Sequence, residues 1–358
     1  MLGGGQMGGG ITRLLTSDRS RVDHHVDDRL RLTQILVRPL KGAKTIEQNA
    51  QARVDYLASA ETWPPNNVPI FADGDTLVIG TERVRFILAD VKGSDPIEGF
   101  DKGSDIVIEA TGALNYLQEF DSLSTRLNTS PDTTYLATHN IDNDGVRTLI
   151  VGVNEIDYDP KKDKVISNGS CTTKCAAAVL KPMLDELGLP GYVEFFGVHG
   201  TTSSQNLEGE ASAGDARKAR TAHTILKTKS GASDGIGKVF PDLKVALTSV
   251  YRVFERDDSV LEMHLHFPSR KDITEEKVND LLRAHAKQYP QVISCVNRKN
   301  FVSNDVALMT QAAVVDMLDT KVIHLGDETI VAVTAYYPHA RGSQAQILYL
   351  ADHVLKNK

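Results

Sequence analysis

A cysteine at the junction of a short strand and a long helix is the feature that most constrains this chain. Residues 164–166 predict a strand, and apolar residues recur at helical spacing over 179–187. Ser170 is a suitable N-cap, so Cys171 should lie in the first turn of the helix. Free backbone N–H groups and the helix dipole stabilise a thiolate there, which favours a nucleophile. A buried structural cysteine is the alternative, and it is the role expected of Cys175 one turn later.

The residues around Cys171 resemble a known family. Residues 169–175 read G-S-C-T-T-K-C, which is similar to the A-S-C-T-T-N-C signature of glyceraldehyde-3-phosphate dehydrogenases. Four further stretches resemble that family in the same order, namely 105–112 (D-I-V-I-E-A-T-G), 151–154 (V-G-V-N), 237–243 (G-K-V-F-P-D-L) and 251–253 (Y-R-V). Aspartate-semialdehyde dehydrogenases share the cysteine and histidine chemistry, but Thr172 and Thr173 fit them poorly.

Length and composition agree with a two-domain enzyme. A chain of 358 residues is long enough for two cores, and a net charge of −7 argues against a basic nucleic-acid-binding face. Three cysteines indicate a reducing compartment without a disulfide framework. The sequence shows neither an apolar run of about 18 residues nor a signal-peptide pattern. We therefore expect a cytoplasmic protein that binds neither nucleic acid nor a membrane.

Alternating strands and helices predict an α/β fold. Residues 1–169 should form a dinucleotide-binding domain with a Rossmann-type doubly wound parallel sheet. Residues 170–337 should form an α+β catalytic domain with a mostly antiparallel sheet, as the alternating stretches 245–253 and 260–267 indicate. The resemblance implies that a terminal helix within 338–358 returns to the first domain.

The N-terminal glycines are candidates for a cofactor site. Gly3, Gly5 and Gly8 fit G-x-G-x-x-G before a plausible helix, although only Met1 and Leu2 stand where a first strand is expected. A glycine-rich terminus without a ligand is the alternative. The resemblance implies that the cofactor is NAD or NADP. The residues expected to contact it are Gly5, Gln6, Met7, Arg38, Thr111, Gly112, Thr138 and His339.

Arg38 bears on the choice between the two cofactors. A strand is expected over 32–37, and the family typically ends it with a carboxylate that binds the adenosine ribose. Arg38 stands at that position and can pair with a 2′-phosphate, which a carboxylate would repel. We therefore expect NADP to be tolerated or preferred. An exposed arginine without a ligand is the alternative.

The resemblance also implies a reaction and its catalytic residues. Cys171 would be the nucleophile, and His199 would stabilise the thiolate as an imidazolium and then act as general base. The substrate phosphate and inorganic phosphate would be held by Ser170, Thr172, Thr202, Ser230, Gly231 and Arg252. Glyceraldehyde 3-phosphate would be oxidised to an acyl phosphate through a cysteine thioester. Erythrose-4-phosphate dehydrogenase and a non-catalytic binding protein are the alternatives.

Some residues depart from the family pattern or fall outside it. Lys174 replaces the asparagine of the signature, and His339 stands where an asparagine is expected to fix the nicotinamide carboxamide.

Residues 206–229 resemble the long S-shaped loop at a subunit interface, so we expect a homotetramer. His264 and His266 share one face of a strand. We expect them to be a satisfied surface pair, and no metal site is expected.

Overall fold

The computed structural model describes residues 6–15, 25–26, 30–32, 34–37, 51, 70–74, 76–79, 82–88, 103–110, 131–202, 205, 223–228, 231–255 and 258–358. The chain forms two compact units. The first comprises Met1–Arg147, Ile156–Asn168 and Ile347–Lys358, and the second comprises Thr148–Glu155 and Gly169–Gln346. Within the described ranges, no helix has the length and apolar character needed to span a bilayer.

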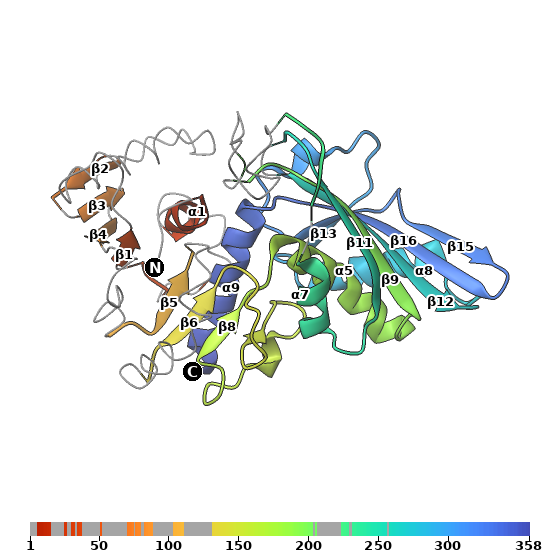
Figure 1. The fold of residues 1–358 in the computed structure, drawn as a ribbon, viewed down its shortest axis with the longest axis horizontal. Coiled ribbons are helices and arrows are strands. Elements are labelled where there is room, and N and C mark those ends of the chain that lie inside the picture. The colour runs from red at the N-terminus through yellow and green to blue at the C-terminus, as the bar shows by residue number, and fades with distance from the viewer. Residues whose placement is uncertain are drawn as a thin grey trace. The chain divides into compact units, whose positions relative to one another are not determined.

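The first unit opens with α1 (Gln6–Leu15), which buries Ile11 and Leu14. A four-stranded sheet follows in the order β1-β4-β3-β2, formed by Gln34–Val37, Glu82–Leu88, Thr76–Ile79 and Ile70–Asp73 (Figure 1). β1 is parallel to β4, and the remaining pairs are antiparallel. β3 and β4 are consecutive antiparallel strands, and Ile79 pairs with Glu82 at their adjoining ends.

A second four-stranded sheet of this unit has the order β5-β6-β8-β7, formed by Ile106–Glu109, Thr134–Ala137, Val165–Ser167 and Arg147–Thr148. β5, β6 and β8 are parallel. Their residues form nearly continuous buried runs, as expected of parallel strands covered on both faces. The final helix, α9 (Arg341–Asn357), contributes its residues from Ile347 onward to this unit.

The second unit is built on an eight-stranded sheet in the order β10-β11-β9-β12-β16-β14-β13, with β15 beside β16 (Figure 1). In chain order its strands are β9 (Tyr192–His199), β10 (Leu226–Thr228), β11 (Val245–Arg252), β12 (Ser259–Pro268), β13 (Ile293–Val296), β14 (Ala313–Asp316), β15 (Lys321–Leu325) and β16 (Glu328–Tyr337). Most neighbouring pairs are antiparallel; β9 with β11 and β13 with β14 are parallel. The predicted fold class is thereby confirmed.

Three helices cover one face of this sheet, namely α5 (Cys171–Leu187), α7 (Ala232–Val239) and α8 (Glu275–Gln288). Two short 3₁₀ helices lie at Glu155–Asp157 and Ser303–Val306. Alternate residues of β12 show the two faces of the sheet: Leu261, Met263 and Leu265 are buried, whereas Glu262 is exposed and His264 is half-buried. The opposite face of the sheet is therefore free to carry polar side chains.

Candidate active site

The helix α5 begins at Cys171, as predicted. Ser170 is its N-cap in extended conformation, and the Ser170 hydroxyl accepts a hydrogen bond of 3.1 Å from the Thr173 backbone N–H. The preceding Gly169 has φ of 65°, a left-handed conformation that glycine adopts without strain. This turn directs the chain from β8 into α5 and leaves backbone N–H groups of the first helical turn next to Cys171.

Strand pairing places four residues in one row across the sheet. His199 at the end of β9 pairs with Arg252 of β11 on one side and with Ser259 of β12 on the other. Ser259 pairs in turn with Tyr337 at the end of β16. Directly paired residues direct their side chains to the same face of a sheet. These four side chains therefore share one face although they come from four strands.

The structure brings Cys171, His199 and Arg252 together. Cys171 Sγ lies 3.3 Å from His199 Nε2, and Cys171 is half-buried while His199 is only 4% exposed. On the opposite side of the imidazole, Arg252 Nη1 lies 2.9 Å from Nδ1 and donates to the Gly200 carbonyl at 3.0 Å. The imidazole is thus held between a thiol and a guanidinium.

This arrangement fixes the charge of His199. Burial, and then the positive charge of Arg252, lower the pKa of His199 to about 3, so the imidazole is neutral at neutral pH. Burial and the neighbouring guanidinium therefore disfavour the imidazolium expected from the resemblance, and the catalytic role of His199 stays a prediction. His199 Nδ1 also lies 2.8 Å from the Gly200 carbonyl oxygen, which can only accept a hydrogen bond, whereas the guanidinium can only donate one. A hydrogen on Nδ1 that is donated to this carbonyl leaves the Nε2 lone pair facing Cys171 Sγ, where it can accept the thiol proton.

Lys174 supplies a positive charge near the same cysteine. Its side chain is 1% exposed, and Nζ donates to the Gly169 carbonyl at 3.0 Å. Burial lowers the pKa of Lys174 to about 8, and negative charge at Cys171 opposes that shift. The ammonium form therefore still predominates at neutral pH. The sequence showed the departure from asparagine, but apolar spacing alone gave no sign that a lysine would be buried there.

Thr172 and Tyr337 form a buried contact that the sequence did not reveal. Thr172 Oγ1 lies 3.0 Å from the Tyr337 hydroxyl, across 165 residues of chain. Burial raises the pKa of Tyr337 well above its usual value, so Tyr337 remains protonated. The sequence analysis placed residue 337 only at the end of the catalytic domain, and the pairing of Tyr337 with Ser259 places it beside α5. The phosphate-binding role of Thr172 stays a prediction.

His339 packs against the same histidine. Its ring centroid lies 4.5 Å from that of His199, its Nδ1 lies 3.2 Å from Ser259 Oγ, and it is 5% exposed. Burial, followed by the charges of His199 and Arg252, lowers the pKa of His339 well below its usual value. Gly200 allows this packing, since a Cβ there would lie 3.1 Å from His339 Cε1. A contact of His339 with the nicotinamide carboxamide stays a prediction.

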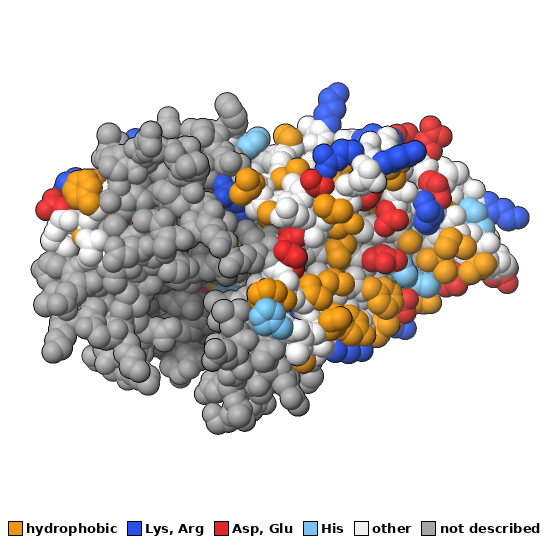
Figure 2. Space-filling model, turned by 90° about the horizontal axis from the view of Figure 1, so that it is seen from above, with side chains coloured by type: hydrophobic (Ala, Val, Ile, Leu, Met, Phe, Trp, Pro, Cys, Tyr) orange, Lys and Arg blue, Asp and Glu red, His pale blue; other side chains and the backbone are white. Residues whose placement is uncertain are grey.

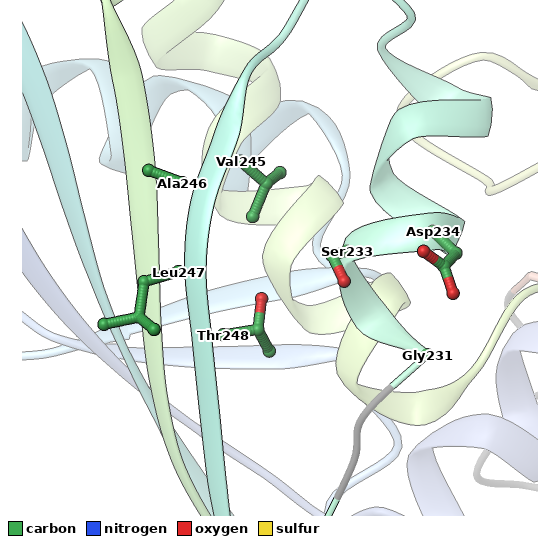
Figure 3. A pocket seen from close by; sticks show the side chains of 7 residues that line it. All are labelled: Gly231, Ser233, Asp234, Val245, Ala246, Leu247 and Thr248. Carbon is green, nitrogen blue, oxygen red and sulfur yellow. The ribbon is translucent and has the colours of Figure 1, made fainter.

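The remaining predicted phosphate contacts are Thr202, Gly231 and Ser230. The Thr202 backbone N–H lies 3.3 Å from Gln205 Oε1. Gly231 is the N-cap of α7 and lines an open pocket of about 410 Å³ between α7 and β11 (Figure 3). Asp234 and Thr248 also line this pocket, whereas Cys171 and His199 do not. Ser230 lies outside the described residues.

The described part of the first unit fits a dinucleotide. Gln6 and Met7, which lie between Gly5 and Gly8 of the glycine motif, open α1, where a pyrophosphate would meet backbone N–H groups of the first helical turn. The parallel strands β5 and β6 end at one edge of their sheet, and the Thr138 backbone N–H donates to the Glu109 carbonyl there at 3.1 Å. Doubly wound sheets bind ligands at this edge. The remaining predicted contacts, Gly5, Arg38, Thr111 and Gly112, lie outside the described residues.

Comparison with known proteins decides the family. Residues 170–338 match the family model described as "Glyceraldehyde 3-phosphate dehydrogenase, C-terminal domain". The chain is also 28% identical over 287 residues to glyceraldehyde-3-phosphate dehydrogenase of Geobacillus stearothermophilus, covering 80% of this chain and 82% of that protein. The chain belongs to the glyceraldehyde-3-phosphate dehydrogenase family.

Other members of the family confirm that this chain is divergent. Glyceraldehyde-3-phosphate dehydrogenase of Chlamydia muridarum is 28% identical over 293 residues, covering 80% of this chain and 82% of that protein. The protein of that name from Borreliella burgdorferi is 30% identical over 218 residues, covering 60% of this chain and 62% of the relative. Cys171, His199 and Arg252 lie inside the matched family domain, whereas His339 lies just beyond it.

Proposed function

We propose that this chain is a phosphorylating glyceraldehyde-3-phosphate dehydrogenase that uses NAD or NADP. The observation that carries the proposal is the distance of 3.3 Å between Cys171 Sγ and His199 Nε2 at the N-terminus of α5. A nucleophile and a base within hydrogen-bond reach are what acyl transfer through a cysteine requires. A non-catalytic binding protein would have no need of this contact. The names of the relatives supply the substrate class.

In the first step the Cys171 thiolate attacks the aldehyde carbon. A carbon–sulfur bond forms, and the carbonyl oxygen becomes an oxyanion that takes up a proton to give a thiohemiacetal. The backbone N–H of Cys171 at the start of α5 is a donor for that oxyanion. Before the attack, His199 Nε2 accepts the thiol proton of Cys171, and the Lys174 ammonium stabilises the thiolate that remains. The same proton then passes from His199 to the oxyanion, which leaves Nε2 free to act as a base in the second step.

In the second step His199 removes the hydroxyl proton of the thiohemiacetal while its carbon–hydrogen bond breaks. A bound nicotinamide ring supplies the hydride acceptor for this oxidation. A thioester on Cys171 remains. The charge of Arg252 is one of the two causes that lower the pKa of His199. A substrate phosphate bound to Arg252 would offset that charge, so His199 becomes the stronger base when the substrate is present.

In the third step inorganic phosphate attacks the thioester carbon. The carbon–sulfur bond breaks, an acyl phosphate leaves, and the thiolate returns. We assign the substrate phosphate to Arg252 and Thr202. The attacking phosphate is assigned to Ser170, Thr172, Ser230 and Gly231. Overall, aldehyde, phosphate and oxidised cofactor give acyl phosphate, reduced cofactor and a proton.

Two assays test the proposal. Absorbance of the reduced cofactor should rise when glyceraldehyde 3-phosphate, inorganic phosphate and NAD or NADP are combined, and Cys171→Ser should abolish the rise. Turnover of erythrose 4-phosphate without a need for inorganic phosphate would instead support the erythrose-4-phosphate dehydrogenase alternative. Cofactor binding by calorimetry without turnover of either aldehyde would show a binding protein. Light scattering should give a homotetramer, which is the assembly we propose.

A further inference from the structure

Two histidines and three glutamates gather on the sheet face opposite the helices. His264 of β12 pairs directly with Glu194 of β9, and His266 lies two residues further along β12 on the same face. Glu262 Oε1 lies 2.6 Å from His264 Nε2, and Glu328 Oε1 of β16 lies 2.8 Å from His266 Nδ1. Figure 2 shows histidines beside acidic and hydrophobic side chains on the surface of this unit. Neutral imidazoles would leave three negative charges here.

His266 lies between two carboxylates. Its Nδ1 contacts Glu328, and its Nε2 lies 3.3 Å from Glu194 Oε2 without the geometry of a hydrogen bond. Stacking on the Tyr192 ring, with centroids 4.1 Å apart, fixes the imidazole plane. With Nδ1 donating its hydrogen to Glu328, the Nε2 lone pair faces the Glu194 oxygen. In this tautomer two acceptors face each other, and either a second proton on the imidazole or a metal ion bound to both atoms would relieve their repulsion.

The spacing of these atoms suits a divalent transition metal. Zn²⁺ binds imidazole nitrogen and carboxylate oxygen at about 2.0–2.1 Å, so two tetrahedral ligand atoms lie about 3.4 Å apart. Glu194 Oε2 and His266 Nε2 are 3.3 Å apart. One ring nitrogen of His264 completes a set of three ligand atoms that lie within 4.8 Å of one another. Metal binding at this set would require the half-buried His264 ring to rotate away from Glu262, which its Nε2 contacts at 2.6 Å.

The surroundings of His266 resemble the outer shell of metal sites. A metal-bound histidine ordinarily donates its other ring N–H to a carboxylate, which fixes the tautomer and orients the ring. Glu328 is in that position relative to His266 Nδ1. Among the ion pairs of the described residues, none brings a lysine or arginine to Glu194, Glu262 or Glu328. A bound cation would therefore supply the missing positive charge.

We propose that Glu194, His264 and His266 form a binding site for Zn²⁺ or a similar late first-row divalent metal, with Glu328 orienting His266. Two imidazoles and one carboxylate favour such metals over Mg²⁺ and Ca²⁺, which prefer oxygen ligands alone. The site lies on the sheet face opposite α5 and is separate from Cys171. It replaces the expectation that His264 and His266 are merely a satisfied surface pair.

Zinc titration of the full chain tests this site. The Cys171→Ser chain is the parent, so that the thiol cannot bind the metal. Calorimetry of the chelator-treated parent with ZnCl₂ should give one Zn²⁺ per chain. His266→Ala and His264→Ala should each weaken binding at least about tenfold, and Glu328→Gln should weaken it about 10- to 100-fold. His324→Ala is the matched control, because His324 on β15 contacts Thr329 Oγ1 at 3.1 Å and not this cluster.

Glu194→Gln separates a loss of metal binding from a loss of folding, because it keeps the shape of a side chain that is 26% exposed while removing its charge. Circular dichroism checks each fold. Zn²⁺ should raise the thermal midpoint of the parent and of His324→Ala but not of Glu194→Gln. The proposal is overturned if the parent binds no Zn²⁺ at millimolar concentration. It is equally overturned if His266→Ala and Glu194→Gln both bind as tightly as the parent. Neither result would affect the proposed dehydrogenase activity.

Discussion

Arg252 and Cys171 contact opposite nitrogens of the same imidazole. Arg252 Nη1 lies 2.9 Å from His199 Nδ1, and Cys171 Sγ lies 3.3 Å from Nε2. The imidazole is therefore neutral in the resting protein, because burial and then the neighbouring guanidinium both lower its pKa. Positive charge for the thiolate comes instead from Lys174 and from the start of α5. The five predictions that follow test this distribution of charge and the cofactor.

Cys171 should react with iodoacetamide faster than the other cysteines at neutral pH. It is half-buried at a helix N-terminus, whereas burial raises the pKa of Cys175 well above its usual value and that of Cys295 to about 11. Mass spectrometry of peptides after timed labelling measures the three rates. Equal rates for Cys171 and Cys295 would contradict the assignment of Cys171 as nucleophile.

Replacing Arg252 by Gln should raise the pKa of His199 toward its usual value, because the neighbouring positive charge disappears. NMR titration of the imidazole measures this pKa directly. The same change should lower kcat/KM for glyceraldehyde 3-phosphate by about 10- to 100-fold through loss of a charged contact. Arg270→Gln is the control, as Arg270 pairs with Asp272 at the surface. An unchanged His199 titration in Arg252→Gln would show that burial alone sets its pKa.

Replacing Lys174 by Met should make the protein more stable and Cys171 less reactive. Burial lowers the pKa of Lys174 from 10.5 to about 8, so its charged form destabilises the fold below pH 8, and this penalty fades as the pH rises to 10.5. Removing the charge should add about 2 kcal/mol to the free energy of unfolding at pH 7 in urea. Iodoacetamide labelling of Cys171 should slow several-fold. Lys181→Met, on the more exposed part of α5, should change neither the free energy of unfolding nor the labelling rate of Cys171.

Acid should destabilise the protein partly through His199. The folded pKa of about 3 lies below the ordinary value of 6.5, so the unfolded chain takes up a proton first as the pH falls. Stability contributed by this group is present above pH 6.5 and is lost between pH 6.5 and about 3, at about 1.4 kcal/mol per pH unit. In thermal melts, the melting temperature of His199→Gln should fall less with decreasing pH over this window than that of the parent. An equal fall in both proteins would mean that His199 is not the titrating group.

Arg38 should decide cofactor preference. Its charge can pair with the 2′-phosphate of NADP, and a contact of about 1.5–3 kcal/mol corresponds to about 10- to 100-fold in affinity. We expect NADP to support turnover at least as well as NAD, and Arg38→Asp to shift the preference toward NAD. Steady-state kinetics with both cofactors measures this. If the parent enzyme uses NAD but not NADP, a residue other than Arg38 binds the adenosine ribose.

Local signals in the sequence predicted much of the fold. The alternating stretches 245–253 and 260–267 form strands whose observed ends differ by at most one residue, because polar and apolar residues alternate along both. The start of α5 followed from Ser170, whose hydroxyl caps the helix as expected. Each of these features depends on residues that are close together in the chain.

Contacts between distant segments could not be predicted in the same way. Arg252 was expected to bind a phosphate, but its contact with His199 depends on the register of β11 against β9. The Thr172–Tyr337 contact depends in addition on the register of β16 against β12. Register is set by packing of whole strands, which a single sequence does not specify. For the same reason the neutral state of His199 was missed.

The row formed by Arg252, His199, Ser259 and Tyr337 makes strand length part of the catalytic apparatus. Adding or deleting one residue within β9 would turn its side chains to the opposite face and remove His199 from Cys171. The requirement extends one residue beyond β9, because the Gly200 carbonyl accepts a hydrogen bond from Arg252. An insertion or deletion in β9 would therefore disrupt this arrangement as completely as the replacement of His199 itself.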